Sequence, residues 1–226
     1  MIRNVSLFFA TALFGTFLSA GAQQTTPPTF LDKQLDRLDL GVNGAGLFTP
    51  TVSGPVNPKG VAPVGDTFLT DNTSNTLGAV ITIRYVVKPL VGFEFNYGYA
   101  RYTENYCCTA VSPSANFGVQ TQADEFTLGY LVQPNYTFFG FKPYASVGAG
   151  STEFKPTAHG GEGLPKQARA TYYYNVGLQD ELSPHFGLRA GFRQTFFLVP
   201  DYGQNYLTIN QRTSSYEPYA GFYLRF

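Results

Sequence analysis

The last eleven residues of the chain alternate between apolar and polar side chains and end on an aromatic residue. One face carries Tyr216, Pro218, Ala220, Phe222, Leu224 and Phe226, and the other carries Glu217, Tyr219, Gly221, Tyr223 and Arg225. Because successive side chains of a β-strand point to opposite faces, this pattern predicts a strand with one apolar and one polar face. In a bilayer, lipid covers the apolar face, and the polar face must then line the inside of a closed barrel.

The N-terminus has the features of a cleaved export signal. Arg3 precedes a mostly apolar stretch, Leu7 to Leu18, and Ala20-Gly21-Ala22 fits the small-residue cleavage pattern. We expect residues 1–22 to be a signal peptide, 23–36 a short periplasmic segment and 37–226 the barrel. Without Arg3, 14 basic residues face 15 acidic ones, a net charge of −1, so nothing indicates nucleic acid as a partner. No later segment has the roughly 18 consecutive apolar residues of a spanning helix.

Eight stretches of the chain alternate in the same way. They are 37–48, 76–86, 91–103, 122–133, 141–153, 169–180, 186–198 and 214–226. The connections at 49–75, 104–121, 154–168 and 199–213 are long, and those at 87–90, 134–140 and 181–185 are short. Long outer loops and short periplasmic turns are typical of outer-membrane barrels. The sequence therefore predicts an all-β fold, an eight-stranded antiparallel up-and-down transmembrane β-barrel with four extracellular loops.

Charged residues within the predicted strands share the polar parity. We predict a charge network inside the barrel, formed by Asp39, Arg84, Glu94, Glu125, Arg189, Arg193, Glu217 and Arg225. An arginine that faced lipid near the midplane would cost about 2–4 kcal/mol, whereas four acids and four arginines can neutralise one another inside. The residues predicted towards the periplasmic ends of the strands are Asp39, Arg84, Glu94, Arg189 and Arg225. Those predicted further from the periplasmic ends are Glu125, Arg193 and Glu217. The alternative is a soluble sheet on which these charges are solvated.

Aromatic residues gather near the predicted strand ends, where an amphipathic ring suits the membrane boundary. We predict a periplasmic girdle of Tyr85, Phe93, Tyr130, Phe141, Phe186 and Phe226, and an outer girdle of Tyr99, Tyr172, Phe196 and Tyr216. Inside, Tyr144, Tyr173, Tyr219 and Tyr223 accompany many inward glycines, and an eight-stranded barrel is narrow enough for side chains to fill. A wide pore is therefore not expected, and a narrow conduit through the charged interior stays open as an alternative.

The eight strands, the export signal and the ending Phe222-x-Leu224-x-Phe226 resemble the small outer-membrane barrels of the OmpA transmembrane-domain and OmpX type, over about residues 37–226. The resemblance implies a bacterial outer-membrane location and contact with outer-membrane lipid and lipopolysaccharide. It also implies that the barrel-assembly machinery reads Phe222, Leu224 and Phe226. The chain stops at the last strand, so anchoring to the cell wall is not implied. We expect a monomer.

Some barrels of this kind modify lipid A, so an enzyme is a further alternative. It is the least favoured one. The only histidines are His185, in a predicted turn, and His159, in a glycine-rich loop that does not favour a held catalytic geometry. Cys107 and Cys108 are adjacent, either free or bridged to each other, and lack the spacing of a metal or redox site. We expect no enzymatic activity, no metal and no cofactor.

The sequence thus predicts an outer-membrane protein with a structural or surface-interaction role. Envelope integrity, adhesion and recognition of an unknown extracellular ligand all fit a rigid framework that displays loops. A narrow outer-membrane channel is the alternative.

Overall fold

The computed structural model describes residues 30–57, 68–88, 90–107 and 117–226. The chain divides into two units, residues 1–33 and 34–226, and the second holds all the strands. The first described element is helix α2 (Phe30–Leu35), in the segment that the sequence predicts as a periplasmic lead-in. Among the described residues, no helix is both long and apolar enough to span a membrane.

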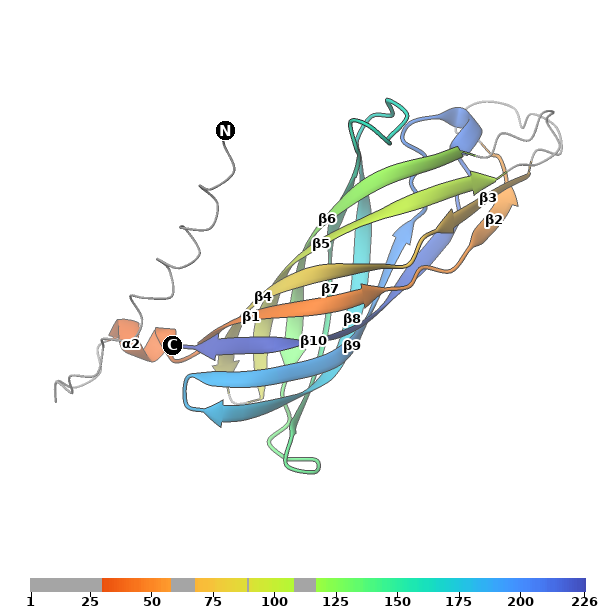
Figure 1. Ribbon diagram of the computed structural model, residues 1–226. Helices are drawn as coiled ribbons and strands as arrows, with labels where there is room; N and C mark the ends of the chain where they lie inside the picture. Colours follow the sequence, from red (N-terminus) through yellow and green to blue (C-terminus); the bar gives the residue numbers. More distant parts are fainter. Residues whose placement is uncertain (1–29, 58–67, 89, 108–116) are drawn as a thin grey trace, which may run out of the picture. The chain divides into compact units, whose positions relative to one another are not determined.

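Eight strands form a closed antiparallel barrel (Figure 1). They are β1 (Leu38–Leu47), β4 (Thr76–Lys88), β5 (Val91–Cys107), β6 (Phe117–Val132), β7 (Lys142–Pro156), β8 (Gln167–Ser183), β9 (Phe186–Leu198) and β10 (Arg212–Arg225). Each of these strands pairs with the next one along the chain, and β1 pairs with β10 to close the ring. The predicted eight-stranded up-and-down barrel is confirmed. One end carries the long connections and the other the short turns; we call these the long-loop end and the short-turn end.

The first long connection contains two short strands that were not predicted from the sequence. Strands β2 (Val52–Pro55) and β3 (Phe68–Thr73) form an antiparallel pair, and β3 pairs with the outer part of β5, where Thr73 lies opposite Glu104. This position is open because the pairing of β4 with β5 ends at Gly78 and Ala100. The two strands have four and six residues, too short for an alternating pattern to stand out from the surrounding prolines and glycines.

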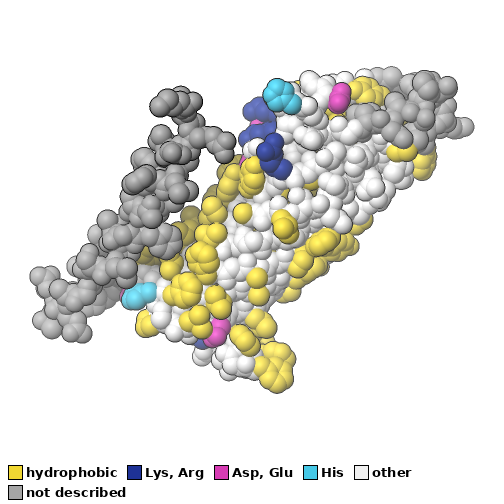
Figure 2. Space-filling view, in the orientation of Figure 1, with side chains coloured by type: hydrophobic (Ala, Val, Ile, Leu, Met, Phe, Trp, Pro, Cys, Tyr) yellow, Lys and Arg dark blue, Asp and Glu magenta, His cyan; other side chains and the backbone are white. Residues whose placement is uncertain are grey.

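The outer wall of the barrel is apolar. Leu128 on β6 and Val147 on β7 are each 61% exposed, and large apolar side chains at alternate positions of the other strands are exposed too. On the face that Figure 2 shows, hydrophobic side chains follow the strands, and charged side chains lie towards the ends. A soluble monomer rarely exposes so large an apolar surface, whereas a bilayer covers it.

The inner wall packs large side chains against glycines on neighbouring strands. Tyr173 lies opposite Gly148, and Tyr144 opposite Gly177. Tyr219 and Tyr223 of β10 face Gly191 and Gly187 of β9 in the same way. A Cβ atom at Gly148 would lie 2.6 Å from Cε1 of Tyr173, closer than real Cβ contacts allow. The predicted large-and-small packing of the interior is therefore present.

Candidate functional site

The interior near the short-turn end holds the lower charge cluster, made of Asp39, Arg84, Glu94 and Arg189. Nη2 of Arg84 lies 2.5 Å from Oε2 of Glu94, and Nη2 of Arg189 lies 3.2 Å from Oδ1 of Asp39. All four residues are at most 2% exposed. Oε1 of Glu94 also accepts hydrogen bonds from the Asn96 amide at 3.0 Å and the Ser146 hydroxyl at 2.9 Å. These extra donors bond the second oxygen of Glu94, which helps to offset the desolvation of the buried ion pair. Nη1 of Arg84 and both Nε and Nη1 of Arg189 have no hydrogen-bond partner among the described residues.

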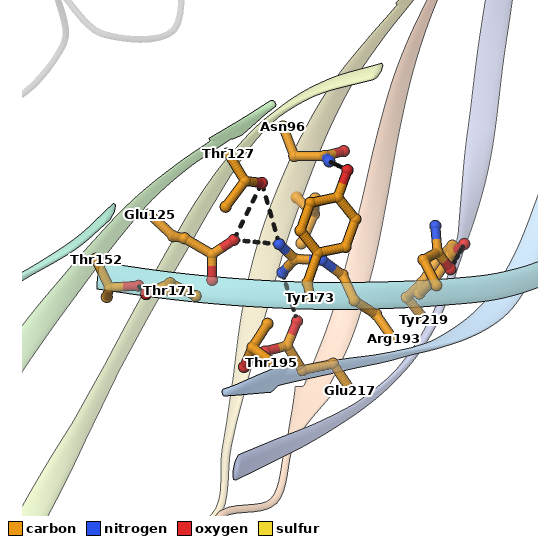
Figure 3. Close-up of polar contacts among 12 residues, drawn as sticks. Asn96, Glu125, Thr127, Thr152, Thr171, Tyr173, Arg193, Thr195, Glu217 and Tyr219 are labelled. Carbon is orange, nitrogen blue, oxygen red and sulfur yellow. Dashed lines mark hydrogen bonds and ion pairs between the residues drawn. The ribbon is translucent and has the colours of Figure 1, made fainter. Parts of the chain in front are cut away.

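The upper charge cluster consists of Glu125, Arg193 and Glu217 (Figure 3). Arg193 on β9 donates from Nη1 to Oε2 of Glu217 on β10 at 2.8 Å, and from Nη2 to Glu125 on β6. Thr195 donates to the other oxygen of Glu217 at 3.0 Å. The guanidinium also lies over the ring of Tyr173, 4.6 Å from its centroid. Because β6 is not next to β9 or β10 in the ring, Arg193 ties separate parts of the wall together across the interior.

Arg225 lies apart from the lower charge cluster, contrary to the prediction from the sequence. Its Nη1 lies 2.8 Å from Oε1 of Glu181, at the mouth of the short-turn end, and its side chain is 29% exposed. Glu181 also pairs with Lys142 at 2.6 Å. Arg225 has the inward parity, but because it is the last residue of β10 it lies at the mouth of the barrel.

Asp124 is an exception to the predicted rule that all strand charges face inward. It shares the outward parity of Phe126, yet the whole residue is 3% exposed. Lys155 covers it at 2.9 Å, and the hydroxyl of Tyr97 donates to it at 2.8 Å. Lys155 also pairs with Glu153, so Asp124 belongs to an ion-pair network on the outer wall. Sequence parity alone cannot show such a network, because its partners come from neighbouring strands.

An apolar cap closes the long-loop end of the barrel. Its members come from the inner faces of β5, β6 and β7, from β3 with the residue after β2, and from the β9–β10 loop: Val56, Leu69, Tyr106, Val119, Ala123, Phe154, Val199, Tyr202, Leu207 and Ile209. All ten are buried. The loop contributes Leu207 from a short 3-10 helix, η1 (Asn205–Leu207). Residues far apart in the sequence thus form one core above the charge clusters.

Polar contacts hold the β9–β10 loop on this cap. The side chain of Gln167, at the start of β8, accepts bonds from the amides of Asp201 and Tyr202 at 3.0 Å and donates to Asp201 at 2.6 Å. Arg169 pairs with Asp201 at 2.9 Å. Although partial burial disfavours its charge, bonds from Gln167 and the Gly203 amide and the charge of Arg169 lower the pKa of Asp201. The loop is therefore fixed to the barrel wall.

Two buried carboxyl groups lie in the cap without a basic partner among the described residues. Glu104 accepts a hydrogen bond from the hydroxyl of Tyr106 at 2.9 Å and another from Tyr202. Asp71 on β3 lies opposite Tyr106 on β5 and is 5% exposed. Its Oδ1 has no hydrogen-bond partner within the described part of the chain. Burial raises the pKa of Asp71 to about 7. Neither residue was predicted from the sequence, because the third predicted strand ends at residue 103 and Asp71 lies in the predicted first loop, 49–75.

Among the described residues, two small cavities lie inside the barrel between its ends. A cavity of about 10 Å³ lies among Asn43, Arg84, Arg189 and Arg193, and one of about 40 Å³ lies between the upper charge cluster and the cap. A vestibule of about 480 Å³ opens at the short-turn end and reaches Asp39. Because a cavity of 10–15 Å³ holds about one water molecule, the smaller space has room for about one water and the larger for a few.

Residues 10–215 of the chain match the family described as outer membrane protein beta-barrel domain. The chain belongs to this family. Its barrel resembles the outer membrane protein OprG from Pseudomonas aeruginosa, with a TM-score of 0.53 and 14% identity over 84% of this chain and 95% of OprG. It also resembles Neisserial surface protein A, with a TM-score of 0.52 and 13% identity over 84% of this chain and 97% of that one. No curated protein matches the sequence. At these identities the structural likeness shows the fold alone.

The aromatic residues predicted as girdles of this outer-membrane barrel lie on its outer wall. Phe93 packs edge-on against Tyr130, with ring centroids 6.1 Å apart, and Phe186 stacks on Phe222 at 6.0 Å. Phe141 lies one residue before β7, and Phe226 one residue after β10. The remaining predicted girdle residues are exposed or partly exposed: Tyr85, Tyr99, Tyr172, Phe196 and Tyr216. Phe222, Leu224 and Phe226 are exposed as well, and their recognition by the assembly machinery stays a prediction.

The remaining candidate residues of this barrel form no reactive arrangement in the part that the structure describes. His185 lies exposed at the short-turn end, where its Nδ1 is 3.2 Å from the carbonyl oxygen of Arg225, and His159 is exposed in the β7–β8 loop. Cys107 ends β5 and is partly buried, whereas Cys108 lies outside the described residues. The described residues include no group of three or more His, Cys, Asp or Glu that could hold a metal.

Proposed function

We propose that this outer-membrane barrel is a structural scaffold that presents a fixed recognition surface outside the cell. The apolar cap is the observation that carries the proposal, because it joins the β2–β3 pair and the β9–β10 loop to the inner wall in one core. A loop that is already ordered loses little conformational entropy when it binds a partner. Asn205, Tyr206 and Asn210 are exposed on the β9–β10 loop and are available for such contacts.

The proposal includes an orientation for the barrel. The long-loop end faces the outside of the cell, and the short-turn end, with the C-terminus, faces the periplasm, as is usual for outer-membrane barrels. Residues 1–22 are then the export signal that is removed, and 23–36 the segment before the barrel. The exposed apolar wall contacts outer-membrane lipid and lipopolysaccharide. The exposed positions of both histidines favour a role without catalysis.

A narrow channel is the second candidate, because the vestibule of about 480 Å³ leads from the short-turn end to Asp39. The two functions differ in what lies above this vestibule. A scaffold keeps both charge clusters and the cap closed, whereas a channel has to open them. Recordings of the purified, refolded protein in a planar lipid bilayer distinguish the two. We expect no stepwise conductance; reproducible current steps that scale with protein concentration would overturn the scaffold proposal in favour of the channel.

A further inference from the structure

The short turn between β6 and β7 exposes a group of aromatic side chains that the scaffold role does not explain. Tyr136, Phe138, Phe139 and Phe141 are all exposed, and Phe139 at the tip is 85% exposed. Residues 133–141 contain no charged side chain. In Figure 1 this turn, drawn in green, projects beyond the ends of its strands, and Figure 2 shows hydrophobic side chains at that extremity. We call residues 136–141 the aromatic turn.

The backbone holds the aromatic turn in a defined shape. The amide of Phe138 donates to the carbonyl of Phe141 at 2.8 Å, and the reverse bond is 3.0 Å long. Phe139 and Gly140 have φ angles of +49° and +87°, the positive pair that a tight two-residue hairpin needs. Asn, Asp and Gly usually fill the first of these positions, and a bulky aromatic there carries a conformational cost. This sequence nevertheless places a phenylalanine at the tip, packed edge-on against Phe138 with ring centroids 4.6 Å apart.

The aromatic turn continues the lipid-facing wall. On β6, the exposed outward residues Leu128, Tyr130 and Val132 lead towards it, and on β7 the outward parity of Val147 leads back to Phe141. The other two short turns differ, because one carries Lys88 and the other carries His185 beside Pro184. Only along β6 and β7, within the described residues, does an uncharged aromatic surface run from the wall onto a short turn.

We propose that the aromatic turn inserts into the headgroup region of the adjacent lipid leaflet and anchors that end of the barrel. Aromatic rings are favoured at the boundary between hydrocarbon and water, where their apolar area is covered. The occupant is a lipid surface because the turn extends a wall that lipid already covers. This inference goes beyond the proposed scaffold role, and it holds equally if the barrel is a channel.

The chain contains no tryptophan, so a single introduced tryptophan reports its own surroundings without background. We would replace Phe139→Trp, and in a second protein Phe138→Trp, and refold each into phospholipid vesicles with bromine either high on the acyl chains or near their ends. We expect emission shifted to the blue of that in water and strong quenching by the shallow bromines, with weaker quenching by the deep ones. A gel-mobility shift on boiling verifies that each variant is folded.

Two matched variants calibrate the depth. Leu128→Trp, on the outward face of β6, should be quenched strongly by the deep bromines, and Tyr206→Trp, exposed on the long-loop end, should emit as in water without quenching. Emission of the Phe139→Trp and Phe138→Trp proteins like that of Tyr206→Trp would overturn the proposal. Blue-shifted emission that no brominated lipid quenches would also overturn it, because the turn would then be covered by protein.

Discussion

Single residues in the barrel interior contribute more to its stability than the number of charges indicates. Arg193 is the sole basic partner of Glu125 and Glu217 among the described ion pairs, so its removal leaves two buried carboxylates without compensation. Replacing Arg193→Met should lower the free energy of unfolding by about 3–5 kcal/mol, the range for breaking a buried pair. Urea unfolding of the barrel in lipid vesicles measures this change.

The control for this prediction is Lys142→Met, which breaks the half-exposed pair with Glu181 and should cost at most about 1 kcal/mol. The triple variant that adds Glu125→Gln and Glu217→Gln to Arg193→Met should recover part of the loss. If Arg193→Met were as stable as the Lys142→Met protein, the upper charge cluster would not be a structural tie.

Asp71 makes the cap sensitive to pH. Its pKa is raised from 3.8 to about 7 by burial, so the folded state holds this proton more tightly than the unfolded state does. The stabilisation is fully present below about pH 4 and is lost as the pH rises through about 7. We expect the amides of β2 and β3 to exchange faster at pH 8 than at pH 5, after correction for intrinsic exchange rates.

The Asp71→Asn variant keeps the shape of the side chain and removes its charge. It should weaken this pH dependence and, at pH 8, stabilise the pairing of β3 with β5 by up to about 4 kcal/mol, since the pKa of Asp71 rises from 3.8 to about 7 and each unit of pKa shift corresponds to about 1.4 kcal/mol. Glu104, whose pKa burial and the charge of Asp71 also raise, keeps part of the pH dependence. An unchanged pH profile in this variant would show that Asp71 is not the group that titrates.

At the scale of elements, the β9–β10 loop is held by its buried side chains. Leu207 is fully buried in the cap, and its neighbour Tyr206 on the same 3-10 helix is exposed. Leu207→Ala should destabilise the cap by about 2–5 kcal/mol through the cavity it leaves, whereas Tyr206→Ala should stay within about 0.5 kcal/mol of the wild type. Hydrogen exchange over residues 199–211 reports the difference. Equal protection in both variants would argue against a packed cap.

The strands and their faces could be predicted because each one has a lipid side and an interior side, which imposes a period of two on the sequence. Strands such as β9, with Phe186 and Leu188 outside and Arg189 and Arg193 inside, follow that period from Phe186 to Arg193. The cap could not be predicted, because Leu69, Phe154 and Leu207 meet only after the barrel closes. The partners of Asp124 and Arg225 could not be predicted for a related reason, since parity gives the direction of a side chain but not its partners.

In the whole molecule, closure of the barrel brings residues that are distant in the sequence into contact, so the position of each one depends on the others. The wall is one ring of paired strands, the charge clusters tie it across the interior, and the cap joins the β2–β3 pair and the β9–β10 loop above them. The central claim is that lipid covers the outer face while protein alone fills the inner face.

Contacts between lipid acyl chains and side-chain methyl groups, measured by nuclear Overhauser effects on the barrel in lipid nanodiscs, test this claim most directly. The outward methyls of Ile81, Ile83, Leu128, Val147 and Leu224 are exposed on the wall, and those of Val80, Val119 and Leu207 are buried. We predict acyl-chain contacts for the first group and none for the second. Acyl-chain contacts at Val80 or Val119, or their absence at Leu128 and Val147, would contradict the account.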